Sequence, residues 1–257
     1  MLLVIDVGNS NTSLGVFSAT ELVAHWRLTT LRSRTVDEYG VHARNLFELA
    51  GLDFKAITAI AIASVVPPLN YTLKTMAETY FNLTPLFVDH TSDTGLKILY
   101  EPASDVGADR IVDAVAAIQK YGAPCIVVDF GTATTFNAIN QKAEYVGGAI
   151  TPGIMISSDA LFERTAKLPR VDIRRPQKVI GSSTIAAMQS GLYHGFVGLV
   201  DGVLRKMIDE IGGTPRVIAT GGLASLIATG SELIELVDDT LTLEGLRLVY
   251  ERNRNPA

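Results

Sequence analysis

Apolar residues recur along the chain with two different spacings, and each spacing predicts a different element. Short apolar runs followed by small or polar residues predict buried strands, for example at residues 2–5 and 126–128. Apolar positions three and four residues apart predict helices over residues 36–50, 69–81, 110–120, 183–211 and 243–252. Breakers or caps separate these stretches, namely Gly51, Pro67, Pro68, Gly122, Gly212 and Gly213. The pattern therefore predicts an α/β fold.

The chain also repeats itself at about half its length. A shift of 123 residues places the motif Asp-Val-Gly-Asn-Ser-Asn-Thr at 6–12 over Asp-Phe-Gly-Thr-Ala-Thr-Thr at 129–135. Without a gap, Glu21 then falls on Glu144 and Val23 on Val146, and a later echo pairs residues 62–64 with 218–220. Duplication explains this order; chance similarity of apolar strands followed by small residues is the alternative. We predict two similar domains, residues 1–115 and 116–257, with a ligand-binding cleft between them.

Composition narrows the classes of protein. Hydrophobic residues make up 47% and charged residues 19% of the chain, as in soluble globular proteins. The net charge of −5 argues against a nucleic-acid partner. Cys125 is the only cysteine, which excludes an internal disulfide and a cysteine-built zinc site and favours a buried thiol. Met1 leads directly into an apolar run without a signal peptide or a membrane span, so we expect a cytoplasmic protein.

Each copy of the repeated motif provides what a nucleotide phosphate requires. Glycine lets the backbone approach closely, and backbone N–H groups donate hydrogen bonds. Nearby hydroxyls can donate as well, from Ser10, Thr12, Thr132, Thr134 and Thr135. The aspartate is an oxygen ligand for the accompanying cation, and we place magnesium beside Asp6. One Asp-x-Gly alone is explained as well by a hairpin turn, but two in register favour an ATP clamp.

Other nucleotide-binding motifs are absent from the sequence. No G-x-x-x-x-G-K-[ST] loop exists and no G-x-G-x-x-G follows a strand, which excludes the P-loop and Rossmann classes. Residues 217–222 end in Thr-Gly-Gly, which would fit against an adenosine or form a simple turn from strand to helix.

A third aspartate, Asp109, lies between the two loops at the predicted start of a helix. Aspartate is a common N-cap, so a purely structural role is one interpretation. Phosphoryl transfer also needs a carboxylate that accepts the proton of the substrate hydroxyl, and Asp109 is available for that role. Arg110 beside it either binds an anionic group or is solvated.

Together these segments resemble type III pantothenate kinases, actin-like enzymes that catalyse the first step of coenzyme A biosynthesis in many bacteria. The resemblance covers nearly the whole chain, in family order. Its segments are Asp6-Val7-Gly8-Asn9-Ser10-Asn11-Thr12, Tyr100 with Gly107-Ala108-Asp109-Arg110, Asp129-Phe130-Gly131-Thr132-Ala133-Thr134-Thr135, Gly147-Gly148-Ala149-Ile150-x-Pro152-Gly153 and Gly181-x-x-Thr184. Two places in the sequence depart from the commoner family residues. Ser183 stands where asparagine is commoner, and Val112-Asp113 stand where Ala-Asn is commoner. These departures leave open how closely the substrate fits.

The resemblance implies two duplicated actin-like (ribonuclease H-like) domains that phosphorylate pantothenate to 4′-phosphopantothenate. It implies Asp109 as the base, Asp129 as ligand of a monovalent cation (potassium or ammonium), and Mg²⁺ with ATP beside Asp6. The residues implied to bind ATP are Asp6, Val7, Gly8, Asn9, Ser10, Asn11, Thr12, Ser13 and Thr132. Those implied to bind pantothenate are Tyr100, Gly107, Ala108, Asp109, Arg110 and Thr184.

The predicted helix over residues 183–211 carries four glycines along one side, at 191, 195, 198 and 202. Glycines weaken a helix, so such a row indicates close approach of another helix, within the chain or in a partner. The resemblance favours a homodimer with this helix in or near the interface, and Tyr193 and His194 as packing residues.

Two other functions remain open at this stage. A sugar or acetate kinase on the same scaffold would keep both loops but not the pairing of Tyr100 with residues 107–110. A nucleotide-responsive regulator would need a DNA-reading element, for which the acidic chain offers no sign.

Overall fold

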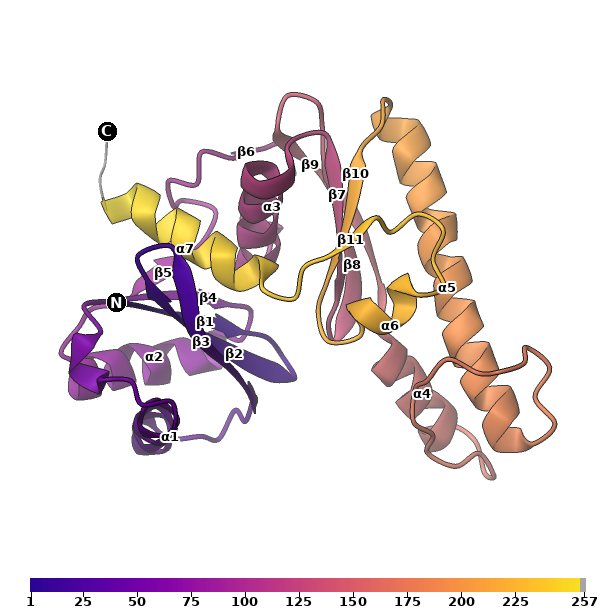
Figure 1. The fold of residues 1–257 in the computed structure, drawn as a ribbon, viewed down its shortest axis with the longest axis horizontal. Helices are drawn as coiled ribbons and strands as arrows, with labels where there is room; N and C mark the ends of the chain where they lie inside the picture. The colour runs from indigo at the N-terminus through magenta and orange to yellow at the C-terminus, as the bar shows by residue number, and fades with distance from the viewer. Residues whose placement is uncertain (255–257) are drawn as a thin grey trace. The chain divides into compact units, whose positions relative to one another are not determined.

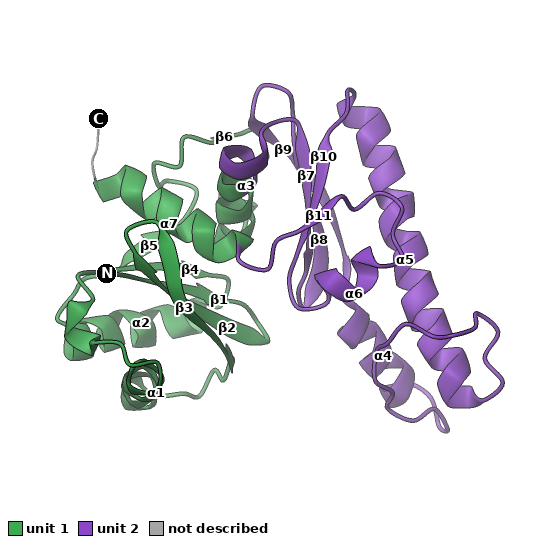
Figure 2. Ribbon diagram, in the orientation of Figure 1, with its two compact units in different colours: residues 1–116, 241–257 green, residues 117–240 purple. Residues whose placement is uncertain are grey.

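The computed structural model describes residues 1–254, which form two compact units (Figures 1 and 2). Unit 1 contains residues 1–116 and the C-terminal segment from Leu241, and unit 2 contains residues 117–240. The first crossing between units lies inside helix α3 (Ala108–Tyr121), one residue from the predicted boundary. The second crossing, after Thr240, differs from the prediction, which assigned the whole C-terminal part to the second domain.

Unit 1 is built on a mixed sheet with strand order β3-β2-β1-β4-β5. Strand β1 runs antiparallel to β2 and parallel to β4. The strands of this unit are β1 (Leu2–Val7), β2 (Asn11–Ser18), β3 (Glu21–Thr29), β4 (Ala59–Ser64), β5 (Leu86–Val88) and the short β6 (Lys97–Ile98). Its other helices are α1 (Val36–Leu49), α2 (Pro67–Met76) and α7 (Leu241–Arg254), with one-turn helices at Phe54–Ala56, Ala77–Phe81 and Ala103–Asp105.

Helices cover both faces of this sheet. Leu3, Ile5 and Val7 point to the face covered by α1 and α2, in a cluster that includes Phe47 and Leu73. The alternate residues of β1 point to the opposite face, as the two-residue period of a strand requires. There they pack against α3 and α7. The sequence reads as continuous apolar runs because the central strands are buried on both faces.

Helix α7 belongs to unit 1 because its apolar face completes this second layer. Leu246 and Val249 are buried with Val4 of β1. Gly245 lies so close to the Val112 carbonyl of α3 that a Cβ would clash with it. The spacing of apolar residues correctly predicts a helix here, but the spacing does not identify the sheet that the helix covers.

Unit 2 repeats the same arrangement, with neighbouring strands in the order β11-β10-β7-β8-β9. These strands are β7 (Cys125–Phe130), β8 (Ala133–Ile139), β9 (Glu144–Pro152), β10 (Arg216–Thr220) and β11 (Leu236–Val237). The helices are α4 (Ile154–Glu163), α5 (Thr184–Ile211) and α6 (Ala224–Ala228). One face of β7 packs against α5 and α6. In the described part of the chain, no helix combines the length and apolar character that crossing a bilayer requires.

The two sheets confirm the predicted duplication. A shift of 123 residues maps the bounds of β1 onto those of β7, and the bounds of β3 onto those of β9. Asp6 pairs with Ala63 across the parallel strands of unit 1, and Asp129 pairs with Thr220 in unit 2. Ala63 therefore corresponds to Thr220, one residue from the match of Ser64 with Thr220 that the sequence suggested.

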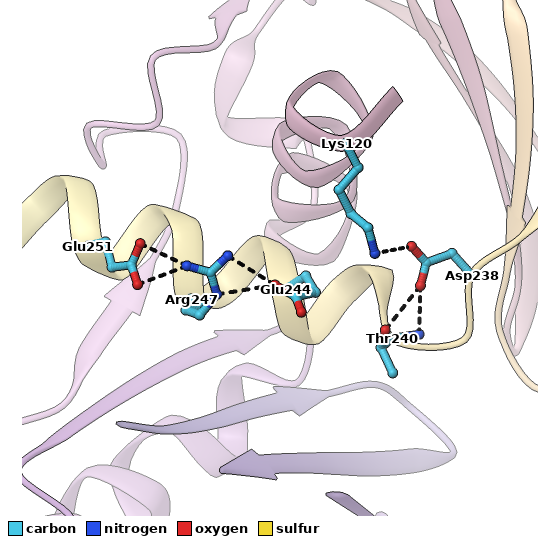
Figure 3. Close-up of polar contacts among 6 residues, drawn as sticks. All are labelled: Lys120, Asp238, Thr240, Glu244, Arg247 and Glu251. Carbon is cyan, nitrogen blue, oxygen red and sulfur yellow. Dashed lines mark hydrogen bonds and ion pairs between the residues drawn. The ribbon is translucent and has the colours of Figure 1, made fainter. Parts of the chain in front are cut away.

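Hydrogen bonds within unit 2 connect the residues next to the two points at which the chain crosses between units (Figure 3). Lys120 Nζ and Tyr121 Oη, just after the first crossing, donate to Asp238 Oδ2 at 2.5 and 2.8 Å. Asp238 Oδ1 accepts from the N–H and hydroxyl of Thr240, the last residue before the second crossing. Burial alone would raise the pKa of Asp238, but the bonds from Lys120 and Tyr121 outweigh it and the pKa is lowered.

Candidate active site

The loop between β1 and β2 is the first candidate element of the site. It turns at Gly8, whose N–H donates to the Asn11 carbonyl at 3.0 Å. A Cβ on Gly8 would lie 3.1 Å from the same oxygen, so a larger residue would strain the turn. Asn9, Ser10 and Asn11 are exposed at the tip. Their amide and hydroxyl groups are of the kind that bind phosphate oxygens.

Thr30, just after β3, holds this loop from the protein side. Its N–H donates to the Ser10 carbonyl at 3.0 Å, and its Oγ1 donates to the Gly8 carbonyl at 2.8 Å. Thr30 Oγ1 has only one hydrogen, so the 2.8 Å contact with Thr12 Oγ1 is a bond that Thr12 donates. Thr12 is 1% exposed, and its hydroxyl supports the loop through this bond. No motif in the sequence indicated Thr30.

Val65 lies between this loop and the segment that carries Asp109. Its N–H donates to the Val7 carbonyl at 3.0 Å, at the end of β1. On its other side, a Cβ on Gly107 would lie 3.3 Å from Val65 Cγ1. Unit 1 therefore brings together two segments that the sequence could only name separately.

Asp109 is the second residue of α3 and does not cap it. The helix opens at Gly107, whose carbonyl accepts the Ile111 N–H at 3.1 Å. Asp109 Oδ1 accepts the N–H of Arg110 at 2.8 Å. Burial raises the pKa of the Asp109 carboxyl, and the N–H and charge of Arg110 oppose this only in part. A Cβ on Gly107 would lie 2.5 Å from Oδ1, so glycine at 107 is a condition for this position of the carboxylate.

Arg110 is buried, with 7% of its surface exposed, which excludes the interpretation of a solvated arginine. Its guanidinium lies over the ring of Tyr100 at 5.9 Å from the centroid. The contact brings together the two parts of the predicted substrate site in unit 1, and a guanidinium held on an aromatic face is suited to bind a carboxylate.

Asp129 occupies the corresponding place in unit 2, at the end of β7. A Cβ on Gly131 would lie 3.2 Å from Oδ2, and a Cβ on Gly221 would clash with Oδ1. Gly221 has φ of 93°, a conformation that glycine adopts readily. Backbone therefore lines both sides of this carboxylate where side chains would fill the space. Residues 221–223 form the turn that leads from β10 into α6.

The glycines of the segment 147–153 bring backbones together beside Thr132. Gly153 donates its N–H to the Thr132 carbonyl at 3.2 Å, and a Cβ there would clash with that oxygen. A Cβ on Gly148 would clash with the Phe136 carbonyl as well. Thr132 is partly exposed in the loop. Thr134 is buried, so its hydroxyl is not presented to a phosphate as the sequence predicted.

Thr184 is the first residue of α5 and is exposed, directly after its N-cap Ser183. Ser183 Oγ accepts the Ala186 N–H at 3.2 Å, so serine caps the helix where the sequence pattern suggested asparagine.

Cys125 is buried as predicted, and burial raises the pKa of its thiol to about 12. Tyr193 is buried too and makes a 3.0 Å hydrogen bond with the hydroxyl of Thr229, as a packing residue does.

Asp6 and Asp129 are the two carboxylates that the sequence assigns to cations. Within residues 1–254, no group of three or more His, Cys, Asp or Glu side chains is arranged to hold a metal ion. Mg²⁺ needs no such group when it binds with nucleotide, because phosphates and water supply most of its ligands. The backbone of Gly131 and Gly221 approaches the two oxygens of the Asp129 carboxylate closely.

Comparison with known proteins gives matches over the length of the chain. The model of the type III pantothenate kinase family matches residues 2–206. A type III pantothenate kinase from Koribacter versatilis (strain Ellin345) is 57% identical over 265 residues, covering 99% of this chain and 97% of that protein.

Two solved structures share the fold at low sequence identity. One is a candidate 2-dehydro-3-deoxygalactonokinase from Sinorhizobium meliloti, with a TM-score of 0.65, 12% identity, and coverage of 100% of this chain and 98% of that chain. The other is a candidate Baf family transcriptional activator from Campylobacter jejuni, with a TM-score of 0.59, 19% identity, and coverage of 98% and 99%. At these identities the similarity shows the fold alone.

Proposed function

Because the chain belongs to the type III pantothenate kinase family, we propose that it transfers the γ-phosphoryl group of ATP to the primary hydroxyl of pantothenate. The product would be 4′-phosphopantothenate, in the first step of coenzyme A biosynthesis. The fold that carries this chemistry is a duplicated actin-like fold of two α/β units. Like other kinases of central metabolism, the protein would act in the cytoplasm.

The observation that carries the proposal is the position of Asp109 in unit 1. Val65 lies between the Asp6–Ser13 loop, where the ATP phosphates would bind, and the Gly107 turn that holds the carboxylate. Oδ1 is engaged by the Arg110 N–H, which leaves Oδ2 to accept the proton of the substrate hydroxyl. A raised pKa makes this carboxylate a better base near neutral pH than an ordinary aspartate.

The reaction then proceeds by in-line transfer. The hydroxyl oxygen forms its bond to the γ-phosphorus while its proton moves to Asp109 and the bond to the β–γ bridging oxygen breaks, so that ADP leaves with the electron pair. Arg110, fixed on Tyr100, would hold the pantothenate carboxylate. Thr184 would contribute to the same substrate and Thr132 to the phosphates.

Cations complete the proposed site. Mg²⁺ with ATP beside Asp6, and potassium or ammonium beside Asp129, would neutralise phosphate charge when bound. The support for the second cation is the Asp129 carboxylate at the end of β7, whose oxygens lie against the backbone of Gly131 and Gly221.

We also propose that the protein is a homodimer through α5. Cβ atoms built on Gly191, Gly195, Gly198 and Gly202 meet nothing within 4 Å, the helix's own neighbouring backbone aside. Among the described residues, no other helix of the same chain therefore packs on these four glycines. This argues against close approach within the subunit. A second copy is the partner that the family resemblance favours.

A coupled assay of ADP formation tests the reaction, with and without pantothenate and with potassium exchanged for sodium. We expect pantothenate to stimulate ADP formation and Asp109→Asn to abolish the stimulation. Asp105→Asn, an exposed carboxylate in the preceding turn, is the matched control. Stimulation by a sugar or acetate and not by pantothenate would instead identify another kinase on this scaffold.

A further inference from the structure

The connection between α4 and α5 concentrates positive charge in an acidic protein. Residues 164–178 contain one acidic side chain, Asp172, and six basic ones: Arg164, Lys167, Arg170, Arg174, Arg175 and Lys178. The segment thus carries +5 while the chain as a whole carries −5, so the remainder carries −10. Such a concentration repels itself unless an anion offsets it.

Residues 164–178, the basic segment, follow α4 and form neither helix nor strand (Figure 1). Hydrogen bonds nevertheless hold the segment against α5. The buried side chain of Gln189 donates from Nε2 to the Asp172 carbonyl at 3.0 Å, and buried Ser190 donates to the Val179 carbonyl just beyond the segment. Arg175 Nη1 donates to the Thr229 carbonyl at 3.2 Å. Such anchoring is not expected of a solvated tail.

A cavity of about 470 Å³ lies between this segment and the start of α5. Its lining includes Arg174, Arg175 and Lys178 together with Gly181 and Ser182. Gly181 lies so close to the backbone of Ala187 that a Cβ would clash with it, so this part of the lining packs directly on α5.

The cations of the cavity are not neutralised within the described part of the chain. Neither Arg174 nor Lys178 forms an ion pair there, and the bond of Arg175 goes to an uncharged carbonyl. Arg170, which does not line the cavity, is the contrast. It pairs with Asp159 at 3.3 Å and stacks on Phe162 at 4.7 Å.

We propose that this basic cavity binds a small phosphate-bearing anion. Two arginine forks and an ammonium group match the charge and the several acceptor oxygens of a phosphate better than the single charge of a carboxylate. A nucleic acid fits poorly, because the cations belong to one bounded cavity in a chain whose remaining charge is −10. The site belongs to unit 2 and is separate from the Asp6–Ser13 loop of unit 1. Its lining residues Gly181 and Ser182 directly precede the Ser183–Thr184 start of α5, so the cavity adjoins the residue proposed to contact pantothenate.

Direct binding tests the proposal, with inorganic phosphate as probe in isothermal titration at constant ionic strength and with saturating ADP to occupy the nucleotide loop. We expect Arg174→Gln/Lys178→Gln to weaken phosphate binding by about tenfold or more, since two charge-assisted bonds are lost. Arg164→Gln/Lys167→Gln removes the same charge from the same segment outside the cavity and should leave the affinity unchanged. Equal weakening by both pairs, or no phosphate binding by the wild type, would overturn the proposal.

Two further arms locate the site and identify the source of the phosphate. Phosphate should protect Lys178 from acetylation, read by mass spectrometry, and should not protect Lys167. 4′-Phosphopantothenate that binds more tightly than inorganic phosphate, and is weakened by Arg174→Gln/Lys178→Gln, would indicate an organic phosphate as ligand of the cavity. Equal affinity of the two probes, weakened by the same pair, would indicate free phosphate, and binding of 4′-phosphopantothenate that the pair does not change would place that probe at the active site and contradict the proposal. Binding to phosphatidylserine vesicles in the absence of phosphate binding would show a membrane contact and contradict the proposal.

Discussion

Thr30 Oγ1 donates to the Gly8 carbonyl at 2.8 Å and thereby stabilises the turn between β1 and β2. The two residues are 22 positions apart, and each is placed by a different strand end. Because Thr12 donates to Thr30 in turn, a short chain of hydrogen bonds fixes the loop without using the exposed side chains at its tip. The side chains at the tip are exposed.

Thr30→Val should therefore weaken the binding of ATP more than it slows turnover. Valine keeps the shape but leaves the Gly8 carbonyl and the Thr12 hydroxyl without their partner, which costs about 1–3 kcal/mol. We expect the KM for ATP to rise by about two- to tenfold if half of this cost falls on the bound state. Thr29→Val, at an exposed neighbouring position, is the control. An unchanged KM for ATP would show that the loop does not depend on Thr30.

Gly107→Ala should reduce kcat while the protein remains folded. The added methyl group would lie 2.5 Å from Asp109 Oδ1, so the carboxylate must move. A displacement of about 1 Å at a reacting group can cost about 100-fold in rate. Steady-state kinetics with Ser104→Ala as a nearby control measure the effect, and circular dichroism checks the fold. A kcat within twofold of the wild type would contradict the assignment of Asp109 as base.

Asp109→Asn should remove activity and at the same time stabilise the protein at neutral pH. The loss of a general base costs about 100-fold or more in kcat. The pKa of Asp109 is raised in the folded state above its ordinary 3.8, so ionisation above that folded pKa favours the unfolded state. The stability gain of Asp109→Asn is thus full above the folded pKa and disappears as pH falls below the ordinary value. Urea midpoints across this range test the sign, and a variant that is less stable at pH 7 would contradict it.

The repeat and the Asp-x-Gly loops were predictable because they are local. A buried strand that ends in aspartate and glycine has the same signature wherever the sheet lies, and one shift in sequence maps β1 onto β7. Asp109 could be placed at a helix start for the same reason. That Asp109 is not the N-cap follows from the Gly107 carbonyl, which accepts the first hydrogen bond of the helix. The sequence pattern does not reveal this bond.

The supporting residues were not predictable because tertiary contacts define them. Thr30 and Val65 are ordinary strand-end residues in the sequence, and they matter only because Gly8 and Val7 lie beside them. The sequence also does not reveal that strand alternation turns the Thr12 hydroxyl into the protein, where it meets Thr30. Helix α7 shows the same limit, since an apolar face does not specify its sheet.

Asp238→Asn should destabilise the protein, because the bond that joins the two crossing points loses its charge (Figure 3). Asp238 has a side chain that is 7% exposed and that of Lys120 is 34% exposed, so we expect a loss of about 1–3 kcal/mol at neutral pH. The folded pKa of Asp238 is lowered, so this contribution is present above the ordinary 3.8 and is lost as pH falls through the folded value. Denaturation at two pH values tests this.

Glu232→Gln is the matched control for that experiment. Its bond to Arg205 is 2.7 Å long, but both side chains are more than half exposed, so its loss should change the stability by less than about 1 kcal/mol. A double-mutant cycle of Asp238→Asn with Lys120→Met isolates the pairwise energy. Equal effects of Asp238→Asn and Glu232→Gln would show that the crossing points gain nothing from this bond.

Gly195→Leu should dissociate the proposed dimer. The position lies in the middle of the glycine row of α5, and a Cβ there meets no other part of the described chain. Leucine therefore fits the isolated subunit and even favours the helix. Against a partner helix it would prevent the close approach that the row permits. Light scattering should show a fall from twice 27.6 kDa to 27.6 kDa, whereas Glu210→Leu on another side of the helix should not change the mass. A wild-type protein that is monomeric at micromolar concentration, or a Gly195→Leu variant that keeps the dimer mass, would contradict an interface at these glycines.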